Sequence, residues 1–402
     1  MDFSLTKEQR DIKRAAREFA RGELTKERAW QYEREHAFPR ELYRKAAQLG
    51  FIGLDYPAEV GGGGLGVTEN VLVIEELCKA DSGIGLAIHL AFLPAKIVKI
   101  FGTEEQRQRY LAPLVRGDFV SAISLTEPDH GCDLTRMSTR MEYRGDRVVL
   151  DGTKIFTTNG AYADFFVVLC QDDPTAGPGQ GMTTVLVDRD PHHHLGGELE
   201  TAEIEGKMGL KMTSSSEVVF KKLALPADRI LGERGRGLQQ VLGFLDQSRI
   251  EIAAQSLGIA EGAFARALAH AKGRKQFGQP IIDFQAVGHI LARMFSRIQA
   301  AKWSTYYAAW ACDHREAAKL ASAVPLLTSM VKHHVPETAK EVLDDAITVF
   351  GGYGYFLEQD VERRYRDNRI IEIYEGTVQI QLNNMVRVLK KLNPDFLDAS
   401  LL

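Results

Sequence analysis

Glu375 is a carboxylate whose position in the sequence allows two chemical roles. It stands two residues before Thr377, where apolar residues at helical spacing begin. A carboxylate there could accept hydrogen bonds from the unpaired amides of a helix start, or it could act as a general base. A helix N-terminus favours the charged form, whereas burial favours the neutral acid. Its immediate neighbours alone favour the role of a helix cap.

Two glycine-rich segments could be mistaken for nucleotide-binding loops. Gly61, Gly63 and Gly66 fit the spacing GxGxxG. A dinucleotide fingerprint needs a strand before the glycines and a helix after them, and here the patterns on both sides are helical. The second segment, residues 232–237, simply precedes a helical pattern. We therefore interpret residues 56–64 as a loop between helices.

Histidine and cysteine residues do not form a convincing metal site. His192, His193 and His194 are adjacent in a loop-like segment without Cys or carboxylate partners at ligand spacing, and His333–His334 falls in a helical pattern, where neighbours do not share a face. The four cysteines are far apart in the sequence, and they are Cys78, Cys132, Cys170 and Cys312. We predict no metal, no disulfide framework, and buried apolar roles for all of the cysteines except Cys132.

Composition and charge narrow the class of protein. The chain has 402 residues, 45% of them hydrophobic and 26% charged, with a formal net charge of −4. That balance gives no electrostatic footprint for nucleic acid. The N-terminus lacks the basic start and apolar core of a signal peptide, and the longest uncharged stretch, residues 82–95, is too short to span a bilayer. We expect a cytoplasmic protein without membrane insertion.

The elements that must position these residues fall into three regions. Residues 1–119 have helical patterns that begin with capping boxes at Thr6 and Thr103. Residues 120–230 contain short β-type runs, and Asp151–Gly152 predicts a hairpin turn. Residues 231–402 are again helical, in long alanine-rich segments at 237–272, 283–315, 317–350 and 377–392. Helices, then strands, then helices indicate an α+β (mainly α) protein with segregated domains.

Several sequence blocks occur in the order and spacing of one enzyme family. They are YPAEVGGG at 56–63, LTEP at 125–128 with Gly131 and Asp133, DGTKIFTTNG at 151–160, RKQFG at 274–278 with FQ at 284–285, FGGYG at 350–354, and IYEGTVQIQ at 373–381. On these blocks, which cover nearly the whole chain, the sequence resembles the acyl-CoA dehydrogenases.

The resemblance implies a fold and a reaction. The fold is an N-terminal helical domain, a middle antiparallel β domain and a C-terminal four-helix-bundle domain, assembled as a homotetramer. The reaction converts an acyl-CoA to its 2,3-enoyl-CoA, with FAD as hydride acceptor and an electron-transferring flavoprotein as the next acceptor. Alternatives within the fold are an acyl-CoA oxidase, an enoyl-CoA reductase, or a non-catalytic FAD-containing binding protein.

By resemblance, Glu375 is the base that removes the α-proton, and its backbone amide helps to hold the enolate oxygen. Some family members carry the base on an earlier helix, just before an arginine. That position holds Ser248 here, beside Arg249, and a serine hydroxyl cannot do this work unaided. Glu375 is then the matching carboxylate, and we expect substrate binding, which expels water, to raise its pKa towards neutrality.

The other expected site residues follow from the same resemblance. Cofactor contacts match Leu125, Thr126, Gly131, Cys132, Phe156 and Thr158 on the flavin side, Arg274, Phe277, Gln285, Gly351 and Gly352 reaching the FAD of a neighbouring subunit, and Thr377 and Gln379 near the adenosine. Substrate contacts match Cys132, Asp246, Arg249, Tyr374 and Gly376. Tyr374 is expected beside the acyl chain, and Asp246 and Arg249 along the CoA channel, although these last two could simply form an intrahelical ion pair.

This chain departs from the family pattern after the LTEP block. The family commonly has Gly-Ala-Gly-Ser there, whereas this sequence has Asp129-His130-Gly131-Cys132. A thiol is a weaker hydrogen-bond donor than a hydroxyl, and Asp129 and His130 add charge and bulk. Phe156 stands where tryptophan is common and lacks the indole N–H donor. We therefore expect a short, branched or cyclic acyl group.

Overall fold

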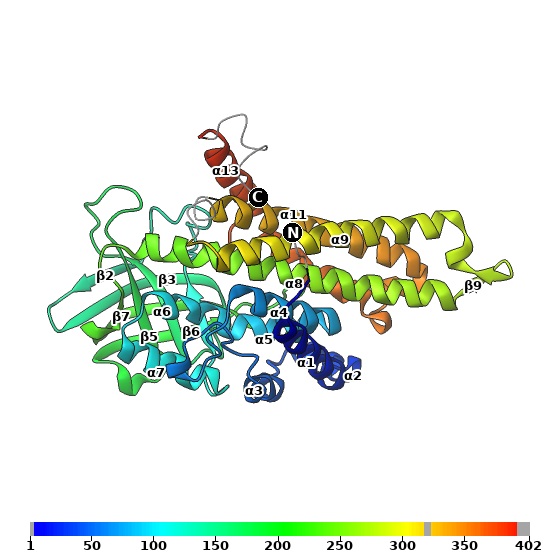
Figure 1. Ribbon diagram of the computed structural model, residues 1–402. Helices are drawn as coiled ribbons and strands as arrows, with labels where there is room; N and C mark the ends of the chain where they lie inside the picture. Colours follow the sequence, from blue (N-terminus) through cyan, green and yellow to red (C-terminus); the bar gives the residue numbers. More distant parts are fainter. Residues whose placement is uncertain (1–3, 317–322, 392–402) are drawn as a thin grey trace.

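A computed structural model describes residues 4–316 and 323–391 and shows a helical N-terminal part, a β-sheet and a long helical bundle (Figure 1). The N-terminal helices are α1 (Lys7–Glu23), α2 (Lys26–Glu35), α3 (Arg40–Gln48), α4 (Val67–Ala80), α5 (Ser82–Phe92), α6 (Lys96–Phe101) and α7 (Glu104–Val115). The three-part layout and the α+β class expected from the sequence are confirmed.

Both capping boxes form as expected. The hydroxyl of Thr6 accepts a hydrogen bond from the Gln9 amide at 3.1 Å, and the Gln9 side chain accepts one from the Thr6 amide at 3.0 Å. Thr103 and Gln106 make the same reciprocal pair at the start of α7. Each box satisfies two amides that a helix start leaves unpaired.

The first turn of α4 has a different cap, which comes from far along the chain. Gly66, the residue before α4, has no side chain. The carboxylate of Asp313, at the end of α9 (Gln285–Asp313), accepts hydrogen bonds from the amides of Val67 and Thr68 at 2.7 and 2.9 Å. This contact joins the C-terminal bundle to the N-terminal helices.

The central sheet has eight strands and is mixed. They are β1 (Ser121–Ser124), β2 (Arg140–Tyr143), β3 (Arg147–Thr158), β4 (Phe165–Gln171), β5 (Met182–Asp188), β6 (Gly196–Glu203), β7 (Ser215–Pro226) and β8 (Ile230–Leu231). Their order is β6-β7-β3-β2-β4-β5-β8, with β1 on β4. The expectation of a purely antiparallel domain needs correction, because β1 and β2 both pair parallel with β4.

The hairpin predicted at Asp151–Gly152 is wrong. Strand β3 runs through both residues, and its register with β7 shifts between Leu150 and Gly152. Gly152 has φ +146°, and a Cβ there would lie 2.6 Å from Cα of Thr139, so the dipeptide makes a β-bulge. The actual turn into β3 is at Gly145, where Arg144 donates to the carbonyl of Arg147 at 2.9 Å.

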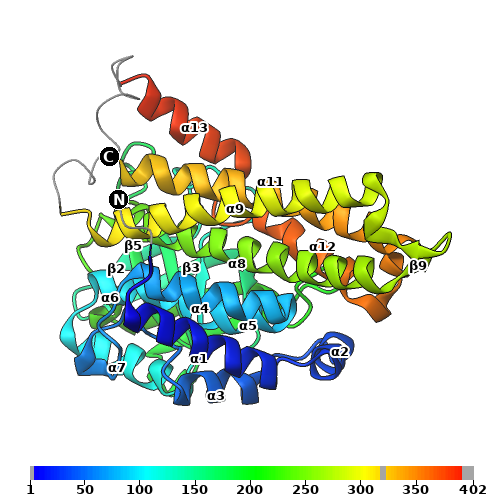
Figure 2. The ribbon, with the colours of Figure 1, turned by 45° about the vertical axis from the view of Figure 1, so that its right-hand side comes forward.

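The bundle consists of α8 (Gly237–Gly273), α9, α11 (Val324–Phe350), α12 (Val361–Arg369) and α13 (Val378–Leu389). The four helical segments expected from the sequence correspond to α8, α9, α11 and α13, and the start of the segment 317–350 lies outside the described residues. Figure 2 shows α8, α9 and α11 side by side, with α13 lying over α11. Helix α8, which is 37 residues long, extends from the sheet to the far end of the bundle.

Helices α4 and α5 pack under α8 and form part of one continuous core. A Cβ at Gly258 of α8 would lie 2.4 Å from the carbonyl oxygen of Glu75 in α4, so these backbones touch. The segment Ser82–Phe101 is 20 residues long, and by length and composition alone it could cross a membrane. However, 83% of its most apolar part is buried inside the protein. Such burial is typical of a core helix.

Candidate active site

Glu375 lies in a short loop between the 3-10 turn Ile370–Glu372 and α13, with an uncommon backbone conformation. Its φ is +57°, and the following Gly376 has φ +88°. A residue with a side chain in this left-handed region is uncommon and costs about 1–2 kcal/mol. Such strain persists where surrounding contacts impose it, and it concentrates at functional sites.

The carboxylate of Glu375 faces α8 and does not cap α13. Its Oε2 accepts a hydrogen bond of 2.7 Å from the Ser248 hydroxyl. The α13 amide of Ile380 is capped by Thr377 instead, whose hydroxyl accepts at 3.4 Å. The helix-cap explanation of Glu375 is therefore wrong, and its carboxylate is available for other chemistry.

Burial raises the pKa of Glu375 above its ordinary value. The Ser248 hydrogen bond and the nearby charges of Arg249 and Lys332 oppose this shift, and the charge of Glu251 adds to it. Burial outweighs the groups that favour the anion. The side chain is deep in the protein yet retains some exposed surface, as a base that must reach a substrate requires.

Three side chains fix the carbonyls of this loop. Arg249 Nε donates to the Glu375 carbonyl at 3.3 Å, and Gln381 Nε2 donates to the carbonyls of Glu375 and Gly376 at 3.3 and 2.9 Å. Lys332 Nζ donates to the Gly376 carbonyl at 3.3 Å. These donors stabilise the left-handed conformation of both residues.

The backbone amide of Glu375 is a free donor. Among the residues that the structure describes, no protein acceptor lies within hydrogen-bond distance of this N–H. An unpaired amide next to a carboxylate can bind an oxygen on which negative charge develops. The loop therefore places a buried carboxylate and an unpaired amide in one residue.

Asp246 and Arg249 form only a loose pair, with 3.7 Å between Oδ1 and Nη1. Arg249 is buried, and burial lowers its pKa. Its 3.3 Å contact with the Glu375 carbonyl is closer than its contact with Asp246. Burial also raises the pKa of Asp246.

Tyr374 starts a chain of buried hydrogen bonds that leads away from Glu375. Its hydroxyl donates to Gln255 Oε1 at 2.5 Å, and Gln255 Nε2 lies 2.7 Å from His89 Nδ1. His89 Nε2 lies 3.0 Å from Glu251, which is ion-paired with Lys96. Burial lowers the pKa of His89, so the neutral ring accepts from Gln255 and donates to Glu251. Of the residues in this hydrogen-bond network, the sequence analysis identified only Tyr374.

Four of the flavin-side candidates lie together, because the segment of Leu125 and Thr126 lies against β3, the strand that carries Phe156 and Thr158. The amide of Ile155 donates to the Thr126 carbonyl at 2.9 Å, which brings the segment of Leu125 and Thr126 against β3. Phe156 has φ +56° and is 63% exposed. In the described part of the chain, the hydroxyls of Thr126 and Thr158 have no hydrogen-bond partner. Free hydroxyls beside an exposed aromatic ring fit the edge and face of the FAD ring that the resemblance implies.

Two charged residues that the sequence analysis did not single out hold the segment of Leu125 and Thr126 against β3. Glu127 is buried and accepts hydrogen bonds from the amides of Ser138 and Thr139 at 2.6 and 2.9 Å. Lys154, fully buried, donates to Glu127 at 2.9 Å and to the Leu125 carbonyl at 3.1 Å. Both residues lie within the sequence blocks that carry the resemblance, which is the signal that could have identified them.

Gly131 and Cys132 follow the tight turn in which Glu127 and His130 exchange backbone hydrogen bonds at 2.9 and 3.1 Å. The Cys132 side chain is exposed, whereas Cys78, Cys170 and Cys312 are buried as expected. Asp129 is also exposed. This loop therefore presents a thiol and a charge at the surface.

A second group of candidates lies at the opposite end of the bundle. Arg274 directly follows α8, with its guanidinium 5.7 Å from the Tyr353 ring beside Gly351 and Gly352. Phe277 contacts Phe284, the residue before Gln285, and is 96% exposed. With a rise of about 1.5 Å per residue, α8 carries this group roughly 40 Å from Ser248. Within one chain these residues do not meet Glu375.

The remaining cofactor candidates, Thr377 and Gln379, lie at the start of α13. The Thr377 side chain is engaged as the cap, and Gln379 is exposed. The structure thus brings Glu375, Gly376, Arg249 and Tyr374 together and places the other candidates in separate groups.

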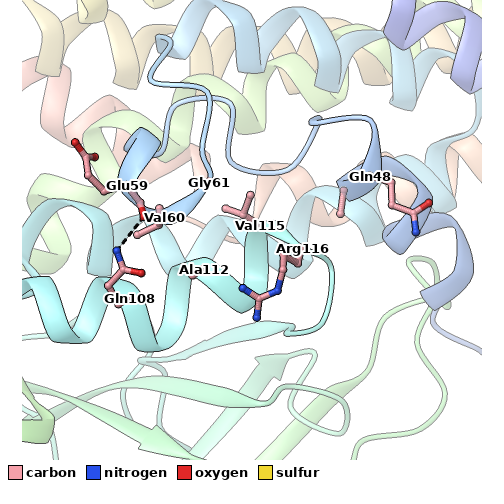
Figure 3. Close-up of a pocket in the computed structure, with 9 residues that line it drawn as sticks. Gln48, Glu59, Val60, Gly61, Gln108, Ala112, Val115 and Arg116 are labelled. Carbon is pink, nitrogen blue, oxygen red and sulfur yellow. Dashed lines mark hydrogen bonds between the residues drawn. The ribbon is translucent and has the colours of Figure 1, made fainter.

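A surface pocket of about 620 Å³ lies between α3, the segment around Gly61 and α7 (Figure 3). Gln108 donates to the Glu59 carbonyl at 2.9 Å across its edge. A 3-10 turn, Ala58–Val60, precedes the glycines in place of a strand, so the loop interpretation is confirmed. Within residues 4–316 and 323–391, no group of three or more His, Cys, Asp or Glu could hold a metal ion.

Comparison with known proteins identifies the same domain order. Residues 6–118, 122–223 and 235–390 match the family models described as acyl-CoA dehydrogenase N-terminal, middle and C-terminal domain. The chain is 38% identical to a short-chain specific acyl-CoA dehydrogenase of Clostridium acetobutylicum, covering 95% of this chain and 97% of that protein.

Two further similarities bear on function. The chain is 35% identical to the caffeyl-CoA reductase-Etf complex subunit CarC of Acetobacterium woodii, over 92% of this chain and 95% of that protein. It superposes on butyryl-CoA dehydrogenase from Megasphaera elsdenii with a TM-score of 0.88 and 33% identity, covering 97% of this chain and 100% of the other.

Proposed function

The chain belongs to the acyl-CoA dehydrogenase family, and from this premise we propose that Glu375 is the base of its reaction. The protein is an FAD-dependent oxidoreductase that acts on the CH–CH bond of an acyl-CoA. The observation that supports the role of Glu375 most strongly is that one residue, in a strained loop, carries both a buried carboxylate and an unpaired backbone amide.

Each contact around Glu375 has a place in the reaction. The carboxylate takes the α-proton of the thioester, and the Glu375 amide binds the thioester oxygen as it becomes an enolate. Ser248 and Arg249 fix the side chain and the carbonyl of the same residue. Thr126, Phe156 and Thr158 would hold FAD, which would supply the acceptor for the hydride that leaves the β-carbon. Exclusion of water by the substrate raises the pKa of Glu375 further.

We propose a short, branched or cyclic acyl group as the substrate. The similarity to a short-chain specific enzyme and to butyryl-CoA dehydrogenase supports a short one. Tyr374 also supports it, because its hydroxyl is held by buried Gln255. Moving this ring to admit a longer chain would leave a buried amide unpaired, which costs about 1–3 kcal/mol. Cys132, Asp246 and Gly376 complete the proposed substrate contacts.

The proposed assembly is a homotetramer in which a neighbouring subunit completes each FAD site. Arg274, Phe277, Gln285, Gly351 and Gly352 lie too far from Glu375 in one chain to share its cofactor, and Phe277 is almost fully exposed. Arginine suits a pyrophosphate, and the left-handed Gly351 lets a ligand approach the backbone. Thr377 and Gln379 would lie on the adenosine side.

We further propose an electron-transferring flavoprotein as the acceptor and the cytoplasm as the location, with domains at 1–119, 120–230 and 231–402. The similarity to a reductase–Etf complex subunit supports such a partner. The same similarity favours a second candidate function, the reverse reduction of an enoyl-CoA. The site chemistry would be the same, with protonated Glu375 returning the proton.

Anaerobic bleaching of the purified yellow protein with a panel of acyl-CoAs tests the proposed function. Short-chain substrates should bleach the flavin rapidly, and Glu375→Gln should slow this roughly 100- to 10,000-fold while retaining FAD. Bleaching of Glu375→Gln at the normal rate would overturn the assignment of the base. Faster turnover of long straight chains would overturn the assignment of the acyl group. Rapid reoxidation in air would identify an oxidase.

A further inference from the structure

Lys332 is a fully buried lysine under the loop that carries Glu375. It lies on α11, and its side chain has no exposed surface. Its ammonium donates hydrogen bonds to the carbonyls of Ile371 at 2.7 Å and Gly376 at 3.3 Å. These two carbonyls lie on either side of Tyr374 and Glu375, so one side chain connects both ends of the loop.

The two other fully buried lysines among the described residues are paired with carboxylates. Lys96 is ion-paired with Asp55 and Glu251, and Lys154 with Glu127. In the described part of the chain, no carboxylate lies within ion-pair distance of Lys332. A buried ammonium without an ion pair is costly, so its retention requires a compensating interaction.

The charges around Lys332 identify that interaction. Burial lowers the pKa of Lys332 to about 8, and Glu375 is the charge that opposes this most strongly. Arg249 on α8 acts in the opposite direction, and Glu372, in the turn before the loop, has a smaller effect than either. Reciprocally, the charge of Lys332 favours the anionic form of Glu375. Lys332 and Glu375 are thus electrostatic partners without a direct contact.

We propose that Lys332 is a positioning residue for the base: it holds the loop in the left-handed conformation that presents Glu375, and it supplies a buried positive charge that favours the reactive carboxylate. The inference rests on the proposed role of Glu375. The proposal thereby adds a residue of α11 to a site whose other residues lie on α8 and in the Glu375 loop.

Lys332→Met tests this proposal, because it removes the charge and the donors while retaining an unbranched side chain. Without the positive charge the pKa of Glu375 rises, so the acid limb of the bleaching rate moves to higher pH. At pH 7 the rate should fall roughly tenfold or more, and it should recover in part as the pH rises. Lys332→Arg, which keeps the charge, should retain the wild-type pH profile.

Lys340→Met is the matched control. Lys340 lies on the same helix and pairs with Glu372 at 3.1 Å, so this substitution perturbs the same region without removing the charge next to Glu375. Its pH profile should match that of the wild type. A Lys332→Met profile identical to that of Lys340→Met would overturn the proposal.

Two further comparisons keep the outcomes distinct. If Lys332→Met does not fold, Lys332→Gln and Lys332→Arg replace it, and equal pH profiles for these two would also overturn the proposal. Glu375→Gln is measured in parallel. Normal bleaching by Glu375→Gln would reject the proposed function itself, whereas slow bleaching by Glu375→Gln with an unaltered Lys332→Met would reject only the role of Lys332.

Discussion

The hydroxyl of Ser248 donates a 2.7 Å hydrogen bond to the carboxylate of Glu375, across 127 positions of sequence. Ser248 occupies the position at which some family members carry the base. The two positions therefore face each other over one small region, and either could deliver a carboxylate to it. In this chain the serine serves the glutamate as a hydrogen-bond donor.

Ser248→Ala should make Glu375 a less available base at low pH. The hydrogen bond stabilises the anion, so its loss raises the pKa of Glu375. A hydrogen bond to a charged group contributes about 1.5–3 kcal/mol, and we expect roughly tenfold slower flavin bleaching on the acid limb, with recovery at higher pH. Stopped-flow rates across pH measure this effect. Ser256→Ala, on the same helix but bonded to Asn368, should leave the profile unchanged; a shift of equal size in both variants would contradict the prediction.

Glu375→Gln should stabilise the folded protein at neutral pH. Burial raises the folded-state pKa of Glu375, so folding favours its protonated form. The stability that protonated Glu375 contributes is complete below the pKa that this residue has in the unfolded chain. It is lost as pH rises through the pKa that the residue has in the folded protein. Glutamine cannot ionise, so the melting temperature of the variant should exceed that of the wild type by a gap that widens from about pH 5 upwards. A gap that narrows with rising pH would show that the anion is the favoured form.

Tyr374→Phe should destabilise the protein through Gln255. The substitution leaves Gln255 Oε1 unpaired in the interior, at a cost of about 1–3 kcal/mol. Gln255→Leu removes the other partner, and the double variant should lose less than the sum of both, because the two side chains share one interaction. Thermal unfolding of the FAD-loaded protein measures each loss. Strictly additive losses would exclude the hydrogen bond as their cause, and Tyr143→Phe, at an exposed site, is the control.

Asp313→Ala should weaken the start of α4. The variant loses the acceptor for the amides of Val67 and Thr68, which is worth about 1–2 kcal/mol for a cap. Asp313→Asn keeps one acceptor and should lose less. The melting temperature should therefore decrease in the order wild type, Asn, Ala. Equal values for Ala and Asn would indicate that the contact does not support the helix.

Local features of this fold could be predicted from the sequence, because their causes are local. The boxes at Thr6 and Thr103 depend on residues three positions apart, and both form as expected. Asp151–Gly152 was misassigned because a glycine with positive φ serves a β-bulge as well as a hairpin. Only the pairing of β3 with β7 distinguishes the two.

The side chains that hold Glu375 and Gly376 in place come from elements that are distant in sequence. Ser248, Lys332 and Gln381 come from three different helices. No rule of sequence spacing connects these three residues. From the sequence alone, Lys332 cannot be distinguished from an ordinary lysine of an amphipathic helix. The resemblance identified Glu375 and Arg249, but the balance between burial and the surrounding charges needed the three-dimensional arrangement.

The length of α8 has a consequence for mixtures of defective subunits. Because α8 contacts Glu375 through Ser248 and ends just before Arg274, roughly 40 Å further along, mutations at Glu375 and at Arg274 damage different sites of the proposed assembly. Subunits carrying Glu375→Gln and subunits carrying Arg274→Ala, each inactive alone, would restore intact sites when they assemble with one another. By such intersubunit complementation, a mixture of the two variants would be active although each variant alone is not.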